Sequence, residues 1–187
     1  TVTKLGIPVI PALENPASDP TVLYEQVKSL GYPVLIKAAA GGGGKGMRIV
    51  REEAELVEAV STAQREAQAA FAEGTVYVER FIERPHHVEV QILGDTNGSL
   101  VHLGERECSI QRRYQKIVEE TPSPAVSQSL RNELTAAALT IAQAAGYYNA
   151  GTVEFILDSE GNFYFLEVNA RLQVEHPITE WITGLDL

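Results

Sequence analysis

Residues 151–169 read GTVEFILDSEGNFYFLEVN, and their pattern predicts a β-hairpin. Two runs in which apolar and polar residues alternate, 152–157 and 163–169, flank the turn residues Asp-Ser-Glu-Gly-Asn. With the turn centred between Glu160 and Gly161, Glu154 lies directly opposite Glu167. Because successive side chains point to opposite faces of a sheet, the hairpin should have one polar and one apolar face.

The two faces of this hairpin have different expected roles. The apolar face faces the core and carries Val153, Phe155, Leu166 and Val168. The polar face carries Thr152, Glu154, Glu167 and Asn169. Two carboxylates directly across a sheet stand about 5 Å apart, and they repel each other by roughly 3 kcal/mol at an effective dielectric of about 20. A divalent cation would reverse that term, which predicts Glu154, Glu167 and Asn169 as ligands of Mg²⁺ or Mn²⁺. The alternative is a solvated strand face on which both glutamates point into water.

A glycine run occupies the middle of residues 32–50, YPVLIKAAAGGGGKGMRIV. Formally it matches the dinucleotide fingerprint, but that turn opens into a helix, whereas the run MRIV indicates a strand. The spacing also fails for a phosphate-binding P-loop, because Ala39 stands where the first glycine is needed. We expect a glycine hairpin that covers a polyphosphate as a mobile lid, with Lys37 neutralising the phosphates. The alternative is a plain flexible connector.

Composition limits the classes of partner. The chain has 187 residues and a formal net charge of -10, so it is a poor candidate for general binding of nucleic acids or anionic membranes. Cys108 is the only cysteine, which indicates a reducing compartment and excludes an intrachain disulfide. The sequence begins without an initiator Met and stops at ITGLDL, so we expect a piece of a longer chain, with a natural end as the alternative.

Two α+β lobes are expected, over residues 1–84 and 85–187, with a nucleotide cleft between them. Expected helices cover residues 20–30, 52–71 and 127–145. The other expected strands cover residues 34–37, 47–50, 75–82, 88–93 and 100–107. A glycine lid with lysines on one lobe and a two-carboxylate metal face on the other together indicate metal–ATP chemistry.

Nearly the whole chain resembles the ATP-grasp region of biotin carboxylase, the biotin-carboxylating component of acetyl-CoA, propionyl-CoA, methylcrotonyl-CoA and pyruvate carboxylases. Glycine loops are shared by many ATP-grasp enzymes. Residues 108–116, CSIQRRYQK, and 167–177, EVNARLQVEHP, are the more specific matches. The resemblance implies an ATP-grasp fold and an ATP-dependent ligase that uses MgATP and bicarbonate to carboxylate biotin through carboxyphosphate. Fatty acid biosynthesis is one process in which such an enzyme takes part.

The resemblance also implies the role of each matching residue. The ATP-binding residues would be Lys37, Gly43, Gly44, Glu79, Arg80, Phe81, Ile82, His87, Gln111, Tyr114, Glu154 and Glu167. Bicarbonate would be held by Lys116, Arg171, Gln173 and Val174. The catalytic residues would be Lys116, Arg171 as the cation that stabilises the biotin oxyanion, and Glu175 as the general base. In an extended segment Arg171, Gln173 and Glu175 alternate, so they are expected to share one face.

The same resemblance implies partners and location. The expected partners are bicarbonate, a biotin carboxyl carrier protein or domain, and a carboxyltransferase subunit or domain, with no nucleic acid and no membrane. The parent is expected to be a homo-oligomer in the cytoplasm, or in the mitochondrial matrix of a eukaryote. Tyr114 stands where many relatives have His, which leaves that nucleotide contact open. The family has further N- and C-terminal parts with substrate contacts, so this chain alone is expected to be inactive. The alternatives are another ATP-grasp ligase, such as the carbamoyl-phosphate synthase large chain, and a nucleotide-binding module without turnover.

Overall fold

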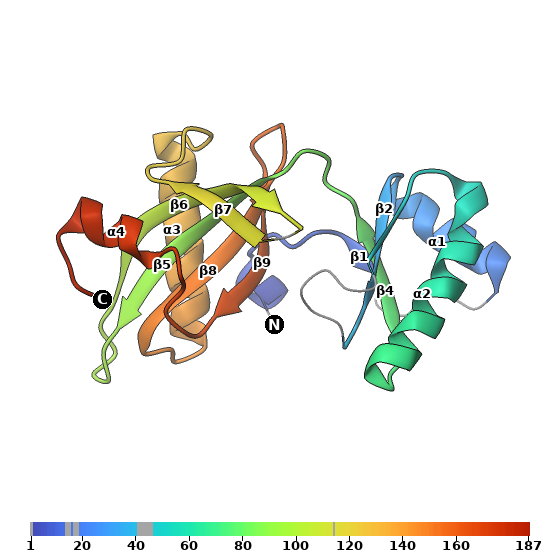
Figure 1. Cartoon of the computed structure of the whole chain (residues 1–187), viewed down its shortest axis with the longest axis horizontal. Coiled ribbons are helices and arrows are strands. Elements are labelled where there is room, and N and C mark those ends of the chain that lie inside the picture. The colour runs from blue at the N-terminus through green and yellow to red at the C-terminus, as the bar shows by residue number, and fades with distance from the viewer. Residues whose placement is uncertain (1, 14–15, 17–18, 41–46, 114) are drawn as a thin grey trace. The chain divides into compact units, whose positions relative to one another are not determined.

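The computed structural model describes residues 2–13, 16, 19–40, 47–113 and 115–187. Contacts between Cα atoms divide the chain into two compact units (Figure 1). The smaller unit is Ile10–Glu83, and the larger unit combines Thr1–Val9 with Arg84–Leu187. The predicted lobes covered residues 1–84 and 85–187. The units differ from them because the first nine residues group with the C-terminal half.

The smaller unit is a four-stranded antiparallel sheet with two α-helices on one face (Figure 1). In the order β1-β4-β2-β3, its strands are β1 (Ala12–Leu13), β4 (Val76–Arg80), β2 (Val34–Ala38) and β3 (Arg48–Val50). Helix α1 (Pro20–Leu30) has the predicted ends, since Asp19 accepts hydrogen bonds from the Thr21 and Val22 amides and Gly31 follows with a φ of 75°. The predicted second helix begins as a 3-10 turn, Glu53–Glu55, and continues as α2 (Leu56–Phe71).

The larger unit is a five-stranded antiparallel sheet with helix α3 (Gln128–Ala144) across one face (Figure 1). In the order β7-β6-β5-β8-β9, its strands are β7 (Gln115–Glu120), β6 (Leu100–Arg112), β5 (His86–Gly94), β8 (Asn149–Leu157) and β9 (Phe163–Asn169). A 3-10 turn, Val2–Leu5, and helix α4 (His176–Thr183) complete the unit. The Ser127 hydroxyl accepts a hydrogen bond from the Leu130 amide and caps α3, so this residue, predicted as the first of the helix, is its N-cap instead.

Strand β5 shows why the larger sheet has two chemically different faces. Val88, Val90 and Ile92 are fully buried in the core that α3 covers. The residues between them, Glu89 and Gln91, are equally buried but point to the other side, as side chains alternate along a strand. The sheet therefore has an apolar face under α3 and a buried polar face opposite.

The β8–β9 hairpin has the predicted pairing around its acidic residues. Glu154 lies opposite Glu167, and Thr152 lies opposite Asn169. The register then shifts, because Phe155 pairs with Phe165, so Leu166 is an extra residue in the ladder.

The bulge also changes which residue of β9 pairs with Phe155 in the core, although Val168 stays opposite Val153. Val153 and Phe155 are fully buried, as expected. From β9, however, Phe163 and Phe165 pack against this core, whereas Val168 is 38% exposed. The Phe155 and Phe165 rings meet edge-on with centroids 6.4 Å apart. The bulge at Leu166 therefore shifts the apolar face of β9 towards the turn and leaves the acidic pair in register.

Residues 2–9 belong with the larger unit because they complete its sheet and core. Val9 forms a parallel bridge with Phe165, and the Phe165 amide donates a 2.8 Å hydrogen bond to the carbonyl oxygen of Pro8. Ile7 is buried in the same core as Val153 and Phe155. A single bridge between two residues has no recognisable sequence pattern, so the pairing of Val9 with Phe165 was not predicted.

Strand β6 is longer than predicted, and β7 was not predicted. The expected strand 100–107 continues to Arg112, and residues 115–120 return beside it. The polar composition of residues 108–120 hid this hairpin, because β7 is an edge strand with mostly exposed side chains. Its presence brings Lys116 over the polar face of the sheet.

An ion pair between Arg131 on α3 and the buried Glu105 on β6 connects the helix to the sheet. Its contribution to the free energy of unfolding should depend on pH. The Arg131 Nε donates to both Glu105 oxygens at 2.8 and 3.0 Å, and the Ser123 amide donates to Glu105 at 3.1 Å. Burial would raise the pKa of Glu105, but these hydrogen bonds hold it below its usual value. A depressed carboxyl pKa stabilises the fold above the unfolded pKa, and this stabilisation is lost as the pH falls through the folded pKa.

Replacing Arg131 by Met is therefore expected to lower the free energy of unfolding by about 3 kcal/mol at pH 7, because it leaves a buried carboxylate without its cation. The loss should shrink as the pH falls through the lowered pKa of Glu105 and its carboxylate becomes protonated. Urea unfolding at pH 7 and pH 3.5 measures both values. Arg65→Met removes an exposed arginine whose guanidinium bonds the Ser61 and Thr62 hydroxyls, and serves as the control. Equal losses at both pH values would contradict the assignment.

Candidate ATP and bicarbonate site

Lys116 lies at the centre of a cluster of carboxylates on the polar face of the larger sheet. Its ammonium contacts Glu89, and it lies 2.9 Å from Glu154 Oε1 and 2.5 Å from Glu175 Oε1. These residues come from β7, β5, β8 and the residue that precedes α4. We call Lys116, Glu89, Glu154 and Glu175 the Lys116 cluster. Their side chains are at most 16% exposed, so the cluster is shielded from water.

The cluster favours the ionised forms of Glu154, Glu175 and Lys116. Burial would raise the pKa of Glu154, but His87, Lys116 and Gln173 hold it far below its usual value. Burial would also raise the pKa of Glu175, but the hydrogen bond from Lys116 keeps this pKa below its usual value. For Lys116, burial would lower the pKa, and the charges of Glu89 and the bond to Glu175 raise it instead. Glu175 is therefore a carboxylate at neutral pH and can accept a proton.

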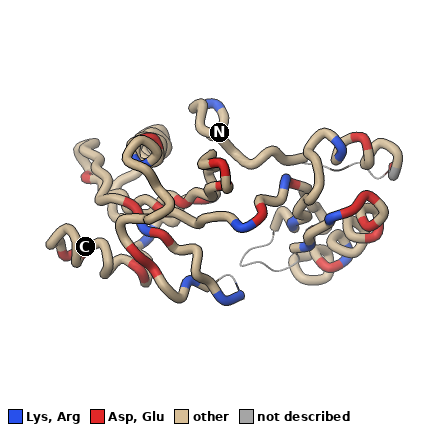
Figure 2. Tube along the Cα trace, turned by 90° about the horizontal axis from the view of Figure 1, so that it is seen from above, with Lys and Arg blue, Asp and Glu red and all other residues tan. Residues whose placement is uncertain are grey.

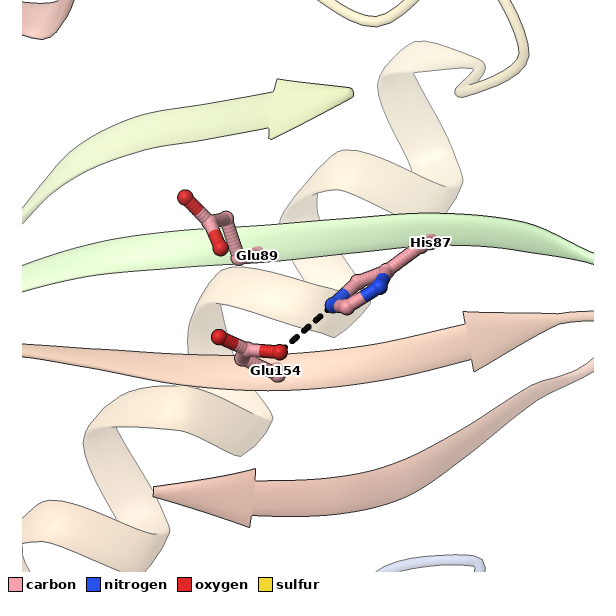
Figure 3. A group of neighbouring side chains, drawn as sticks. All are labelled: His87, Glu89 and Glu154. Atoms are coloured by element: carbon pink, nitrogen blue, oxygen red, sulfur yellow. Dashed lines mark hydrogen bonds and ion pairs between the residues drawn. The ribbon is translucent and has the colours of Figure 1, made fainter. Parts of the chain in front are cut away.

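His87 is bonded to Glu154 in one defined tautomer. Figure 3 shows His87 and Glu89 on β5 and Glu154 on the neighbouring β8, all on the same side of the sheet. The His87 Nε2 lies 2.5 Å from Glu154 Oε2, and the Gln111 amide donates to His87 Nδ1 at 2.8 Å. Because Nδ1 accepts that bond, Nε2 carries the proton and donates to Glu154. The predicted nucleotide residues His87, Gln111 and Glu154 are thus brought together.

The predicted metal ligands also lie together. The Asn169 amide nitrogen lies 2.8 Å from Glu154 Oε1 and 3.3 Å from Glu167 Oε1, so it bridges the opposed carboxylates. Glu154 is buried and Glu167 is exposed. Two carboxylates and an amide, with one side open to solvent, form an oxygen-rich set that suits Mg²⁺ or Mn²⁺. This donor set therefore fits the predicted ion.

A second group of possible metal ligands overlaps the Lys116 cluster. One ligand atom each from His87, Glu89 and Glu154 lies within 4.8 Å of the others. Lys116 already pairs with both of those carboxylates. Its ammonium supplies the positive charge there, so Glu167 and Asn169 mark the better place for an ion.

The residues predicted to bind bicarbonate or to act in catalysis separate into two groups. Gln173 is buried and donates to Glu154 Oε1 at 2.9 Å, and Glu175 pairs with Lys116. Arg171 is exposed, and its Nη1 donates to the Leu172 carbonyl oxygen at 3.2 Å. Val174 as a whole residue is 91% exposed, although the prediction concerned its backbone.

The prediction that Arg171, Gln173 and Glu175 share one face of an extended segment is wrong. The His176 amide donates to the Gln173 carbonyl oxygen at 3.3 Å, which closes a turn that leads into α4. This turn directs Gln173 and Glu175 to the Lys116 cluster and leaves Arg171 outside it.

Two residues of the site were missed, Glu89 and Arg106. Both are fully buried, and Arg106 Nε donates to Glu89 Oε1 at 2.6 Å. The pattern Val-Glu-Val-Gln in residues 88–91 could have revealed Glu89, because a strand that alternates so regularly must place its polar residues together. No local signal marks Arg106, since its partners come from four other segments.

In the smaller unit the structure brings Lys37 and Glu79 together. The Lys37 ammonium lies 2.5 Å from Glu79 Oε1 and 6.0 Å from the centroid of the Tyr77 ring. Arg80 ends β4, the Phe81 amide donates to the Pro33 carbonyl oxygen, and Ile82 is buried. Gly43, Gly44 and Tyr114 lie outside the described residues. The cleft between the two lobes stays a prediction.

Charge is mixed along the described part of the chain. Figure 2 shows Lys and Arg interspersed with Asp and Glu in each unit. Among the described residues, no helix has the length and apolar character needed to cross a membrane.

Comparisons with known proteins agree with this geometry. The family model for the carbamoyl-phosphate synthase L chain, ATP binding domain, matches residues 1–187. A biotin carboxylase of Nostoc is 54% identical over the whole chain, which covers 42% of that relative. The pyruvate carboxylase 1 of Caenorhabditis elegans is 52% identical over 98% of this chain, and the match covers 16% of that relative.

Two solved structures share the fold. A biotin carboxylase complex with β,γ-ATP from Campylobacter jejuni has a TM-score of 0.90 and 45% identity, over 99% of this chain and 42% of the other. The biotin carboxylase domain of the Hydrogenobacter thermophilus 2-oxoglutarate carboxylase, in complex with MgADP, ADP and bicarbonate, has a TM-score of 0.88 and 48% identity, over 99% and 41%. The chain thus spans about two-fifths of the length of these two proteins and of the Nostoc relative.

The α+β class, the ATP-grasp fold and the resemblance to biotin carboxylases are therefore confirmed. The chain belongs to the family of the carbamoyl-phosphate synthase L chain ATP-binding domain, and within it is similar to the ATP-grasp region of biotin carboxylases.

Proposed function

We propose that the chain is the ATP-grasp part of a biotin carboxylase, an ATP-dependent ligase in which MgATP and bicarbonate carboxylate biotin through carboxyphosphate. The observation that carries this proposal is the buried pairing of Lys116 with Glu175 beside Glu154, which also faces Glu167 and Asn169. This pairing supports the proposal because the residues proposed as the anion-binding cation, the proton acceptor and the metal ligands belong to one hydrogen-bonded group. The relatives named biotin carboxylase support the same assignment.

In the proposed reaction, Lys116 and the Gln173 amide bind bicarbonate, whose charge the ammonium neutralises. Glu175 accepts the bicarbonate proton while a bicarbonate oxygen bonds to the γ-phosphorus of ATP and the bond to ADP breaks. The products of this step are carboxyphosphate and ADP. Carboxyphosphate then decays to CO₂ and phosphate, the released phosphate takes the proton of biotin's ureido N–H, and the deprotonated nitrogen bonds to the CO₂ carbon. Arg171, exposed and close in sequence to Gln173, is proposed to stabilise the ureido oxyanion.

Glu154, Glu167 and Asn169 would hold Mg²⁺ or Mn²⁺. The ion, when bound, would offset the negative charge of the nucleotide phosphates. The chain's own contribution is to fix the oxygen ligands, because Glu154 is oriented by hydrogen bonds from His87, Gln173 and Lys116. The further ATP contacts proposed are Lys37, Glu79, Arg80, Phe81, Ile82 and Gln111, together with Gly43, Gly44 and Tyr114.

The finer assignments remain proposals of the same kind. The parent protein is proposed to act with a biotin carboxyl carrier and a carboxyltransferase, as a homo-oligomer, in the cytoplasm or the mitochondrial matrix. Relatives named as mitochondrial methylcrotonoyl-CoA carboxylase subunits are 52% identical in rice and mouse. Fatty acid biosynthesis is one proposed process, beside those of the pyruvate and methylcrotonoyl-CoA enzymes.

Phosphate release from MgATP tests the function in the full-length protein. We expect release to require bicarbonate and to increase when free biotin is added. The 187-residue chain alone is expected to show no turnover, because it spans about two-fifths of the biotin carboxylases that it matches. Release that ignores biotin and requires ammonia would instead support a carbamoyl-phosphate synthase. ATP binding with no release from the full-length protein would support a binding module.

A further inference from the structure

Arg106 on β6 uses all of its hydrogen-bonding capacity inside the larger unit. Its side chain is 0% exposed. A guanidinium has five N–H donors, and the structure shows five acceptors for them. These are Glu89 Oε1 at 2.6 Å, Gln91 Oε1 at 2.8 Å, Thr179 Oγ1 at 2.8 Å, Thr152 Oγ1 at 3.3 Å and Gln173 Oε1 at 3.4 Å. Arg106 thus joins β5, β8, the turn before α4 and α4 itself.

The first consequence concerns the position of Lys116. Arg106 Nε holds one oxygen of Glu89, and the other oxygen of the same carboxylate contacts the Lys116 ammonium. The carboxylate therefore lies between two cations and is fixed from both sides. If Arg106 is removed, the Glu89 side chain can rotate, and Lys116 loses one of the three carboxylates that place it.

The second consequence concerns the orientation of the Gln173 amide. Arg106 donates to the oxygen of this amide, so its nitrogen faces Glu154 and donates to Oε1 at 2.9 Å. The reverse orientation would set the amide oxygen against the Glu154 carboxylate. Arg106 thereby decides which end of the Gln173 amide points into the Lys116 cluster.

The third consequence concerns Glu175. It precedes α4 directly, and Thr179 in that helix accepts a hydrogen bond from Arg106. Thr179 is 1% exposed, so the bond is fully inside the protein. The start of α4, and with it the carboxylate of Glu175, is anchored to the sheet through the same guanidinium.

We propose that Arg106 is a positioning residue for bicarbonate, acting through Glu89, Gln173 and α4 to place Lys116, the Gln173 amide and Glu175. The inference rests on the proposed function, because it assumes that these three groups meet bicarbonate. Arg106 itself is fully buried and touches no substrate. A purely structural arginine would support the fold equally for every substrate, whereas a positioning arginine affects the bicarbonate site selectively.

The experiment measures steady-state kinetics of bicarbonate-dependent ATP cleavage in the full-length protein with Arg106→Lys and Arg106→Met. Lysine keeps the charge but has three donors and no planar fork, so it cannot serve all five acceptors. We expect the KM for bicarbonate to rise about tenfold to a hundredfold, the range typical of losing a partner that orients a ligand. The KM for MgATP should change less than about threefold, because Glu154 keeps its bonds to His87, Lys116 and Asn169. Arg106→Lys should be the milder variant.

Arg131→Met is the matched control for stability. Like the Arg106 variants, it removes an arginine that bonds a buried glutamate; here the glutamate is Glu105 on β6. In the described part of the chain, neither Glu105 nor Arg131 bonds to the Lys116 cluster. We expect it to lower the melting temperature and to leave both KM values unchanged. The inference is overturned if the Arg106 variants keep the wild-type KM for bicarbonate, or if Arg131→Met raises that KM as much as they do.

Glu89→Gln provides a second route if the Arg106 variants do not fold. The amide oxygen can still accept from Arg106, which turns the NH₂ group towards Lys116 and displaces the ammonium. A rise of about tenfold in the KM for bicarbonate is expected, and an unchanged KM would refute the relay through Glu89. A wild-type protein without bicarbonate-dependent cleavage would instead refute the proposed function, and the positioning role with it.

Discussion

The kcat of bicarbonate-dependent ATP cleavage is expected to fall about a thousandfold when Glu175 is replaced by Gln, because positioned general bases contribute about 10²–10⁴ to a rate. Glutamine has nearly the same shape but cannot take the bicarbonate proton. The pKa of Glu175 lies below its usual value, so the wild-type side chain is already a carboxylate at neutral pH. The KM for MgATP should stay within about twofold.

The fold should survive this substitution, since Lys116 keeps its pairs with Glu89 and Glu154. Initial rates of phosphate release in the full-length protein, at saturating MgATP and bicarbonate, provide the measurement. Glu180→Gln, in the helix that directly follows Glu175, is the matched control and should retain the wild-type kcat. Its side chain accepts a hydrogen bond from the Leu187 amide, which the Gln oxygen can still accept. Unreduced turnover by Glu175→Gln would assign the base to another group.

Glu167→Gln is expected to raise the Mg²⁺ concentration needed for half-maximal ATP cleavage by about tenfold to a hundredfold, or about 1.4–2.8 kcal/mol of binding free energy. The substitution removes one of two opposed charged oxygen ligands and leaves Glu154 and Asn169 in place. Glu167 is exposed, so its loss should not disturb the core.

A melting experiment separates this loss of metal binding from a loss of fold. In the absence of metal, the melting temperature of Glu167→Gln should equal or exceed that of the wild type, because one of two opposed charges is gone. Added MgADP should then stabilise the variant less than the wild type. Glu160→Gln, in the turn of the same hairpin, controls for the change in net charge. A wild-type response of Glu167→Gln to Mg²⁺ would show that the acidic pair does not hold the ion.

Local alternation was enough to predict the acidic hairpin. The register of Glu154 and Glu167 was predicted correctly, although the turn was centred slightly too late in the sequence. The bulge at Leu166 compensates, because it adds one residue to β9 just before Glu167. The helix cap at Asp19 was predicted correctly as well, since a cap depends on neighbours within three residues.

Long-range polar contacts could not be predicted in the same way. Arg106 gathers partners from residues 89 to 179, and no spacing in the sequence encodes such a set. Residues 173–176 were predicted to be extended, because polar and apolar residues still alternate there in the sequence. In the structure the backbone turns at these residues to start α4. Edge strand β7 lacks the apolar period that marks a buried strand. Fold and hairpin therefore follow from local patterns, whereas the interior of the site depends on tertiary packing.

Pro8 and Val9 shield the outer edge of β9 by pairing with Phe165. A protein cut to begin at Arg84 would leave backbone groups of that edge open beside the partly buried rings of Phe163 and Phe165. Open edges with apolar neighbours template strand addition between molecules and so favour aggregation. A stand-alone version of the larger unit should therefore keep residues 2–9 and bridge directly from Val9 to Arg84, with the smaller unit treated as a removable insertion.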